Sequence, residues 1–157
     1  MKLNNSQVKA LKIILDKLNN TTIKWVLGGS TNLALQGVDV IAHDIDIATN
    51  KKGAYEIESV LKQYIIKKVK FTSNDKFRSY YGLLKIEDTS VEILGNCEYY
   101  NLKTKKWEKG SKTITREYID FKGYKLPVYN LETELNFYKG ASREEKAKKI
   151  EERIKAL

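Results

Sequence analysis

The sequence predicts an α/β (α+β) fold in which helices flank a mixed β-sheet. Three observations support this prediction. Apolar residues recur with a helical period near both ends of the chain, and apolar and polar residues alternate through its middle. No Gly/Ser-rich linker or internal repeat interrupts the 157 residues. Because a chain of this length can bury roughly 70% of its surface on folding, we expect one domain, residues 1–157.

Helices and short strands alternate in the first part of the chain. Val8, Leu11, Leu15 and Leu18 recur at i, i+3, i+7 and i+10, which predicts a helix over residues 6–18. The further elements expected here are a strand at 23–27, a helix at 30–35 with Ser30 as its N-cap, a strand at 43–49 and a helix at 54–65.

The rest of the chain is expected to form strands up to residue 129 and helices after it. Pro127 cannot donate to a β-ladder, so we expect the last strand at an edge, or Pro127 at its end. The expected strands are 69–72, 77–87, 90–94, 113–121 and 124–128. The expected helices are 131–138 and one that begins with a capping box at 142–145.

Composition excludes several classes of protein. One cysteine, Cys97, permits no intrachain disulfide, and a single histidine excludes the usual Cys/His zinc sites. No apolar run approaches ~20 residues and no signal peptide opens the chain, so we expect a cytoplasmic protein without membrane spans. The net charge of +9 suits a polyanionic partner or a phosphate-bearing substrate, although it can also reflect only the composition of the organism.

Asp44 and Asp46 form the most informative pair of side chains. In a strand both point to one face, while Ile45 and Ile47 point to the other. Two carboxylates so close repel each other, and strands disfavour aspartate, so the pair indicates a cation between them. Oxygen ligands of this kind suit Mg²⁺ or Mn²⁺. The alternative is two solvated aspartates on an exposed strand face.

A glycine turn precedes this pair. Gly28 and Gly29 end an apolar run and let the backbone approach a ligand closely. Ser30 then opens a helix, whose free N–H groups favour phosphate. An ordinary strand-to-helix turn is the alternative.

Taken together, Gly29-Ser30, thirteen residues and Asp44-x-Asp46 resemble the signature of the nucleotidyltransferase superfamily with the DNA polymerase β-like fold. Compact minimal, lincosamide-type and abortive-infection-type members are the most similar. The resemblance implies a polymerase β palm-like fold, with a catalytic core at about 22–96 and C-terminal strands and helices at 112–157. It also implies a third acidic residue on a later strand, for which Glu92 is the candidate and Asp88 the second choice.

A weaker likeness lies near the C-terminus. Compact members place a lysine on one helix and an arginine at the start of the next, and Lys139 and Arg143 fit these positions as nucleotide contacts. Lys146 stands where the family has an acidic residue, which breaks the pattern. The alternative is a solvated helix face of mixed charge.

The resemblance implies transfer of a nucleoside monophosphate from a nucleoside triphosphate to a hydroxyl, with release of pyrophosphate. Asp44, Asp46 and Glu92 would be the catalytic residues and the ligands of Mg²⁺ or Mn²⁺. The acceptor stays open among RNA such as a tRNA end, a protein and a small molecule, and an oligomer could complete the site. A non-catalytic nucleotide- or nucleic-acid-binding module of the same fold is the alternative function.

Overall fold

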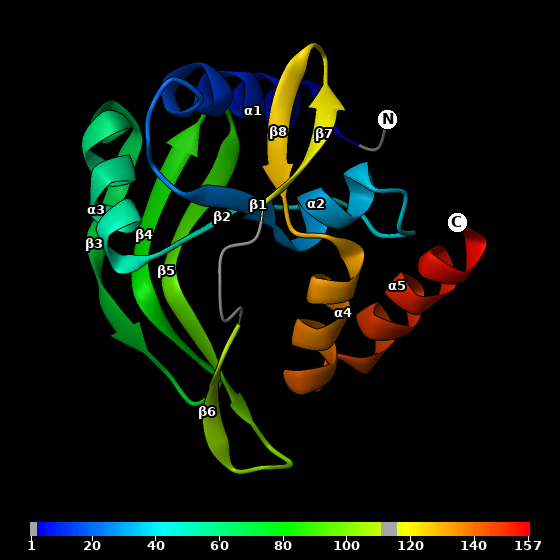
Figure 1. Ribbon diagram of the computed structural model, residues 1–157. Helices are drawn as coiled ribbons and strands as arrows, with labels where there is room; N and C mark the ends of the chain where they lie inside the picture. The colour runs from blue at the N-terminus through cyan, green and yellow to red at the C-terminus, as the bar shows by residue number, and fades with distance from the viewer. Residues whose placement is uncertain (1–2, 111–115) are drawn as a thin grey trace.

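The computed structural model describes residues 3–110 and 116–157 as a mixed β-sheet with flanking helices (Figure 1). The predicted α/β (α+β) fold is confirmed. The helices are α1 (Asn5–Leu18), α2 (Gly29–Leu35), α3 (Lys51–Val60), α4 (Leu131–Gly140) and α5 (Glu144–Ala156), with a 3-10 turn η1 (Lys62–Tyr64). The strands are β1 (Trp25–Gly28), β2 (Ile45–Thr49), β3 (Ile65–Ser73), β4 (Phe77–Ile86), β5 (Thr89–Asn101), β6 (Lys106–Lys109), β7 (Glu117–Phe121) and β8 (Tyr124–Val128).

The strand order in the sheet is β3-β4-β5-β2-β1-β8-β7, and β6 pairs with β5. The pairs β2–β5 and β1–β8 are parallel, whereas β1–β2, β3–β4, β4–β5 and β7–β8 are antiparallel. The adjacent strands β1, β2 and β5 therefore bring the glycine turn, the aspartate pair and Glu92 close together.

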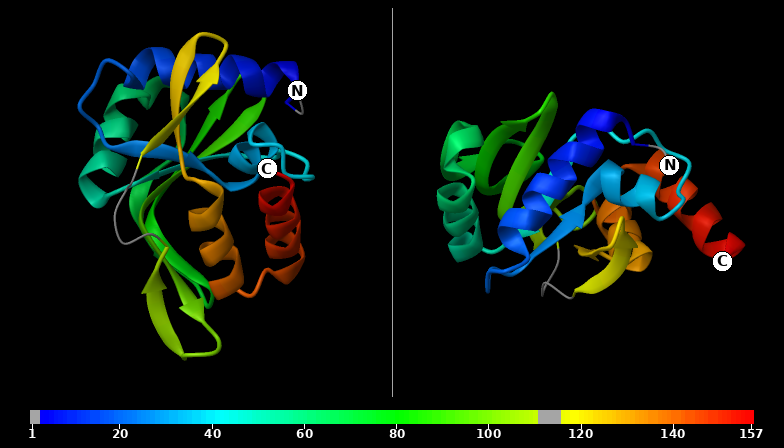
Figure 2. Two further views of the ribbon diagram at one scale, coloured as in Figure 1. Left: turned by 45° about the vertical axis from the view of Figure 1, so that its right-hand side comes forward. Right: turned by 90° about the horizontal axis from the view of Figure 1, so that it is seen from above.

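Two apolar clusters hold the helices to the sheet. The larger one joins α1 and α3 to one face of the sheet, where α1 contributes Leu11, Ile14 and Leu15 and the strands contribute Ile47 and Ile93, all fully buried. The smaller cluster packs α2 against α4 and α5. Figures 1 and 2 show the result: α1 and α3 lie on one side of the sheet, and α4 and α5 lie together beside its other face.

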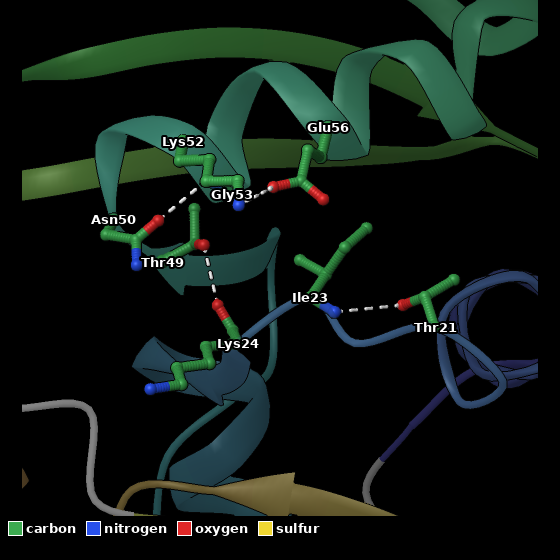
Figure 3. Close-up of polar contacts among 8 residues, drawn as sticks. All are labelled: Thr21, Ile23, Lys24, Thr49, Asn50, Lys52, Gly53 and Glu56. Atoms are coloured by element: carbon green, nitrogen blue, oxygen red, sulfur yellow. Dashed lines mark hydrogen bonds and ion pairs between the residues drawn. The ribbon is translucent and has the colours of Figure 1, made fainter.

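The start of α3 fixes the end of β2 (Figure 3). The Asn50 side chain accepts the Gly53 N–H at 2.7 Å and caps the helix, and the Thr49 hydroxyl donates to the Lys24 carbonyl at 2.7 Å. A Cβ at Gly53 would overlap the Thr49 hydroxyl oxygen, so only glycine lets α3 pack this closely on β2.

Several expected boundaries are wrong for identifiable reasons. Gly28, not Ser30, is the N-cap of α2, because Ser30 already lies within the helix. Ser142 makes no capping box, since Arg143 is the N-cap of α5 and no side chain caps it. Sequence analysis missed β6, whose four residues are mostly charged. The first residues of the strand expected at 113–121 lie outside the described residues.

Candidate active site

The Asp44–Asp46 pair and Glu92 converge through the register of two parallel strands. Asp46 on β2 lies directly opposite Glu92 on β5. Their neighbours Ile45, Ile47, Val91 and Ile93 point to the other face and are fully buried against the α1–α3 layer. Because side chains alternate along a strand, burial of these four aliphatic residues turns the carboxylates to the open face.

Asp46 lies against the glycine turn. Gly29 has φ +71°, a conformation that side-chain-bearing residues rarely adopt. A Cβ at this position would overlap Oδ2 of Asp46. The turn predicted from Gly28-Gly29 is therefore built around the Asp46 carboxylate, and glycine is required here on two independent grounds.

Hydrogen bonds from α2 fix the segment that carries Asp44. The backbone N–H of His43 donates to the Ser30 hydroxyl at 3.0 Å, and the Thr31 hydroxyl donates to the Asp44 carbonyl at 2.8 Å. Ser30 is 8% exposed and Thr31 is fully buried. Since the Ser30 oxygen already accepts, its own proton stays available for a ligand in the cleft.

Proximity of the carboxylates changes their protonation. Burial raises the pKa of Asp46 well above its usual value, and the carboxylates of Glu92, Asp44 and Glu134 add to the effect. Burial and Asp44 likewise raise the pKa of Glu92. Hydrogen bonds from Tyr81 and Asp46 to Glu92 act in the opposite direction. Without a cation, the Asp46 and Glu92 groups are therefore close enough to share a proton.

Tyr81 on β4 is hydrogen-bonded to Glu92 of the Asp46–Glu92 pair. Its hydroxyl donates to Oε1 of Glu92 at 3.3 Å. Burial and the nearby Glu92 carboxylate raise the pKa of Tyr81 to about 12, so the phenol stays protonated as a donor. Sequence analysis missed Tyr81, because only the β4–β5 register reveals that it reaches Glu92.

Glu134 on α4 is a further carboxylate that sequence analysis missed. It is 4% exposed and accepts a hydrogen bond from Asn32 of α2 at 2.9 Å and another from the Gly29 N–H. Burial raises the pKa of Glu134 to about 7. Its sequence signal is an acid on the apolar side of the expected helix, three residues after Leu131 and four before Tyr138.

The C-terminal basic residues divide into two groups. Arg143 lines the cleft, with its guanidinium carbon 5.4 Å from the Phe77 ring centroid. Lys146 also lines the cleft, and it lowers the pKa of Asp46 and of Glu134. Lys139 is not brought to the cleft: it points to Glu151 of α5, with which it forms a 3.1 Å ion pair. The structure thus places Lys146, and not Lys139, beside the carboxylates.

One cleft of about 1100 Å³ is lined by the carboxylates Asp44, Asp46, Glu92 and Glu134 and by Ser30, Tyr81, Arg143 and Lys146. One wall is formed by residues of β4, β5 and the end of β6, and the other by residues of α4 and α5. Phe77 of β4 stacks on Phe137 of α4 with ring centroids 6.1 Å apart, which joins the two walls. Gly28, Gly29 and Ser30 line the same cleft as Asp44, Asp46 and Glu92. The cleft is large enough for a nucleotide and a second substrate.

The donor set fits a hard divalent cation by its chemistry. Asp44, Asp46 and Glu92 offer oxygen atoms alone, and burial together with neighbouring carboxylates raises the pKa of Asp46 and Glu92. Over residues 3–110 and 116–157, however, no group of three or more His, Cys, Asp or Glu side chains stands ready to hold a metal. Asp46 and Glu92 are hydrogen-bonded to each other, and Asp44 lies near enough to raise the pKa of both.

The fold that carries this cleft is that of nucleotidyltransferases. The aminoglycoside-2''-adenylyltransferase family matches residues 10–153, and the chain belongs to this family. A protein from Thermotoga maritima described as a nucleotidyltransferase (TM1012) is 36% identical, with 99% of this chain and 96% of that chain covered and a TM-score of 0.81. The family resemblance stated from the sequence is therefore confirmed. A comparison with curated proteins gives no match.

Two more distant structures share the fold. The lincosamide antibiotic adenylyltransferase LnuA, solved with lincomycin bound, is 18% identical over 94% of this chain and 98% of that chain, with a TM-score of 0.56. ANT(2'')-Ia, solved in complex with adenylyl-2''-tobramycin, is 13% identical over 93% of this chain and 88% of that chain, with a TM-score of 0.57. In the described part of this chain, no helix is long and apolar enough to cross a membrane.

Proposed function

We propose that the chain transfers a nucleoside monophosphate from a nucleoside triphosphate to a hydroxyl group, with Asp44, Asp46 and Glu92 as its reaction centre. The observation that carries this proposal is the opposition of Asp46 and Glu92 on β2 and β5, directly beside the Gly29 turn. Membership of the aminoglycoside-2''-adenylyltransferase family supports the same class of reaction.

The glycine turn and Ser30 would bind the phosphates of the donor nucleotide. Gly28 and Gly29 let the backbone approach the phosphates, and Ser30 has a hydroxyl proton to donate. Arg143 and Lys146 on the opposite wall supply positive charge to the same ligand. Lys139, held by Glu151 outside the cleft, has no part in this proposal.

Asp44, Asp46 and Glu92 would hold Mg²⁺ or Mn²⁺. When bound, the cation would neutralise phosphate charge as a Lewis acid. With the cation bound, the carboxylates of Asp46 and Glu92 would both be ionised.

In the transfer step the acceptor oxygen forms a bond to the α-phosphorus. The bond from that phosphorus to the oxygen bridging to the β-phosphate breaks, and pyrophosphate leaves with the electron pair. Glu92 takes the proton of the acceptor hydroxyl. Tyr81 keeps Glu92 oriented through its 3.3 Å hydrogen bond, and most of the rate enhancement comes from positioning and charge neutralisation.

A label-transfer assay tests this proposal. The protein is incubated with each labelled nucleoside triphosphate and Mg²⁺ or Mn²⁺, with total RNA, protein extract and antibiotics offered as acceptors. We expect transfer of label by the wild type and none by the double variant Asp44→Asn/Asp46→Asn. Asp120→Asn is the matched control, because Asp120 is an exposed strand aspartate on β7, away from the cleft.

Metal-independent nucleotide binding that survives the double substitution, with no label transfer to any acceptor, would contradict the proposal. That result would instead favour a non-catalytic nucleotide- or nucleic-acid-binding module of the same fold.

A further inference from the structure

We infer that the acceptor is a phosphate-bearing compound with a free hydroxyl, and not a polycationic aminoglycoside; this inference rests on the proposed function. The inference rests on which charged side chains in the cleft already have a partner. A polycation needs unpaired carboxylates to replace the water that its ammonium groups lose, whereas a phosphate needs unpaired cations.

Every carboxylate of the cleft already has a partner or a proposed role, so none is free to bind a cationic acceptor. Asp44, Asp46 and Glu92 belong to the proposed reaction centre. Glu98 on β5 accepts a 2.6 Å hydrogen bond from the Arg78 guanidinium and is neutralised by it. Glu134 is buried and held by Asn32 and the Gly29 N–H. No other Asp or Glu lines the cleft among the residues that the structure describes.

The cations of the cleft show the opposite pattern. Lys24, Lys109, Arg143 and Lys146 line it, and in the described part of the chain none of the four has a carboxylate within ion-pair distance. Arg143 and Lys146 lie over the Tyr138 ring at 6.0 Å and 5.7 Å instead. The sequence of residues 111–115, outside the described ranges, contains one lysine and no acid.

The donor nucleotide does not use up this positive charge. Arg143 and Lys146 lie beside the carboxylates and suffice for a triphosphate that also carries metal. Lys109 at the end of β6 and Lys24 before β1 line other parts of the cleft and stay without an anion. The net charge of +9 would steer an anionic acceptor to the same cleft.

Aromatic rings beside these cations suit an acceptor that carries a base. The Arg143 guanidinium carbon lies 5.4 Å from the Phe77 ring centroid, and Phe77 and Phe137 both line the cleft. Both an RNA 3' end and a nucleoside monophosphate offer a phosphate, a hydroxyl and a stacking base. In either case the acceptor oxygen bonds to the α-phosphorus, pyrophosphate leaves, and the hydroxyl proton passes to Glu92.

Pyrophosphate release with saturating triphosphate and Mg²⁺ tests the inference. The acceptors offered are a short RNA with a free 3' hydroxyl, a nucleoside 5'-monophosphate, tobramycin and lincomycin, and water alone gives the basal rate. We expect at least a tenfold increase with the RNA or the monophosphate and none with tobramycin. Comparison of the first two acceptors shows whether the phosphate belongs to a polymer or to a small molecule.

Charge variants sharpen this test. Lys109→Glu is expected to raise the KM of the anionic acceptor at least tenfold, while Lys12→Glu on the exposed surface of α1 leaves it unchanged. The KM should also rise with ionic strength.

An increase with tobramycin equal to or greater than that with both phosphate-bearing acceptors would overturn the inference and leave the proposed function intact. Failure of both phosphate-bearing acceptors to raise the basal rate would overturn it too. Failure of the proposed function gives a different result: no pyrophosphate is released under any condition, and Asp44→Asn/Asp46→Asn does not differ from the wild type.

Discussion

The two faces of β2 and β5 carry residues of opposite character. On the face toward α1 and α3, Ile45, Ile47, Val91 and Ile93 are fully buried in the apolar cluster. On the other face, the residues between them are Asp46 and Glu92, whose pKa values are raised by burial and by neighbouring carboxylates. One face therefore contributes folding free energy, and the other stores charge repulsion that a ligand can relieve.

Substitution of Asp46 separates the two faces most clearly. We expect Asp46→Asn to lower nucleotide transfer by about a thousandfold or more, about 4 kcal/mol of transition-state stabilisation. The variant should keep or gain stability, because it removes a repelling carboxylate. Transfer assays and chemical unfolding measure the two effects. A variant that loses stability in proportion to activity would show that Asp46 is mainly structural.

A substitution on the apolar face should lower stability and leave nucleotide binding unchanged. Ile93→Ala leaves a cavity beneath α1 and α3, and we expect it to lower the free energy of unfolding by about 3 kcal/mol. The KM for nucleotide should stay close to that of the wild type at a temperature where the variant is folded. Urea unfolding and steady-state kinetics test this, and a tenfold change in KM without a loss of stability would refute the separation.

Glu134 should make the stability of the folded protein depend on pH. The folded protein holds a proton on Glu134 up to its pKa of about 7, whereas the unfolded chain releases it at a lower pH. Between these values the folded state binds more protons, so the stability of the metal-free protein falls as pH rises. This pKa difference corresponds to about 3 kcal/mol of unfolding free energy, which is lost at high pH. We expect Glu134→Gln to raise the unfolding free energy at pH 8 by about 2 kcal/mol, less than the full amount because an amide makes weaker hydrogen bonds.

Urea unfolding at pH 5 and pH 8 measures this difference. Glu132→Gln, an exposed neighbour on α4, is the matched control and should leave the pH dependence unchanged. If Glu134→Gln keeps the wild-type slope of stability against pH, Glu134 is already ionised in the folded state.

Ser30 should give the smallest effect. Ser30→Ala removes a single donor to phosphate and the acceptor of the His43 N–H, so we expect about a tenfold loss of kcat/KM, or about 1.4 kcal/mol. Gly29 and Asp46 remain in place. Steady-state kinetics with varied triphosphate test this, and a loss similar to that of Asp46→Asn would show that Ser30 does more than contact phosphate.

How far the sequence predicts this molecule depends on whether the signal is local. The alternation around Asp46 and the turn at Gly28-Gly29 are local patterns, so the fold class and the first half of the cleft follow from them. The roles of Tyr81 and Glu134 depend on contacts with distant residues, which no local pattern reveals. The position of Lys139 could not be predicted for the same reason: the residue fits a motif by spacing, yet its side chain pairs with Glu151 outside the cleft.

Ligand-induced stabilisation tests the central claim most directly. Thermal unfolding is followed at pH 8 for the wild type and Asp46→Asn, each with and without Mg²⁺ and a non-hydrolysable nucleoside triphosphate. We predict that both ligands together stabilise the wild type, by about 2.7 kcal/mol at a hundredfold excess over Kd, and leave Asp46→Asn almost unchanged. Equal stabilisation of the two proteins would contradict a metal-nucleotide site on the carboxylate face of β2 and β5.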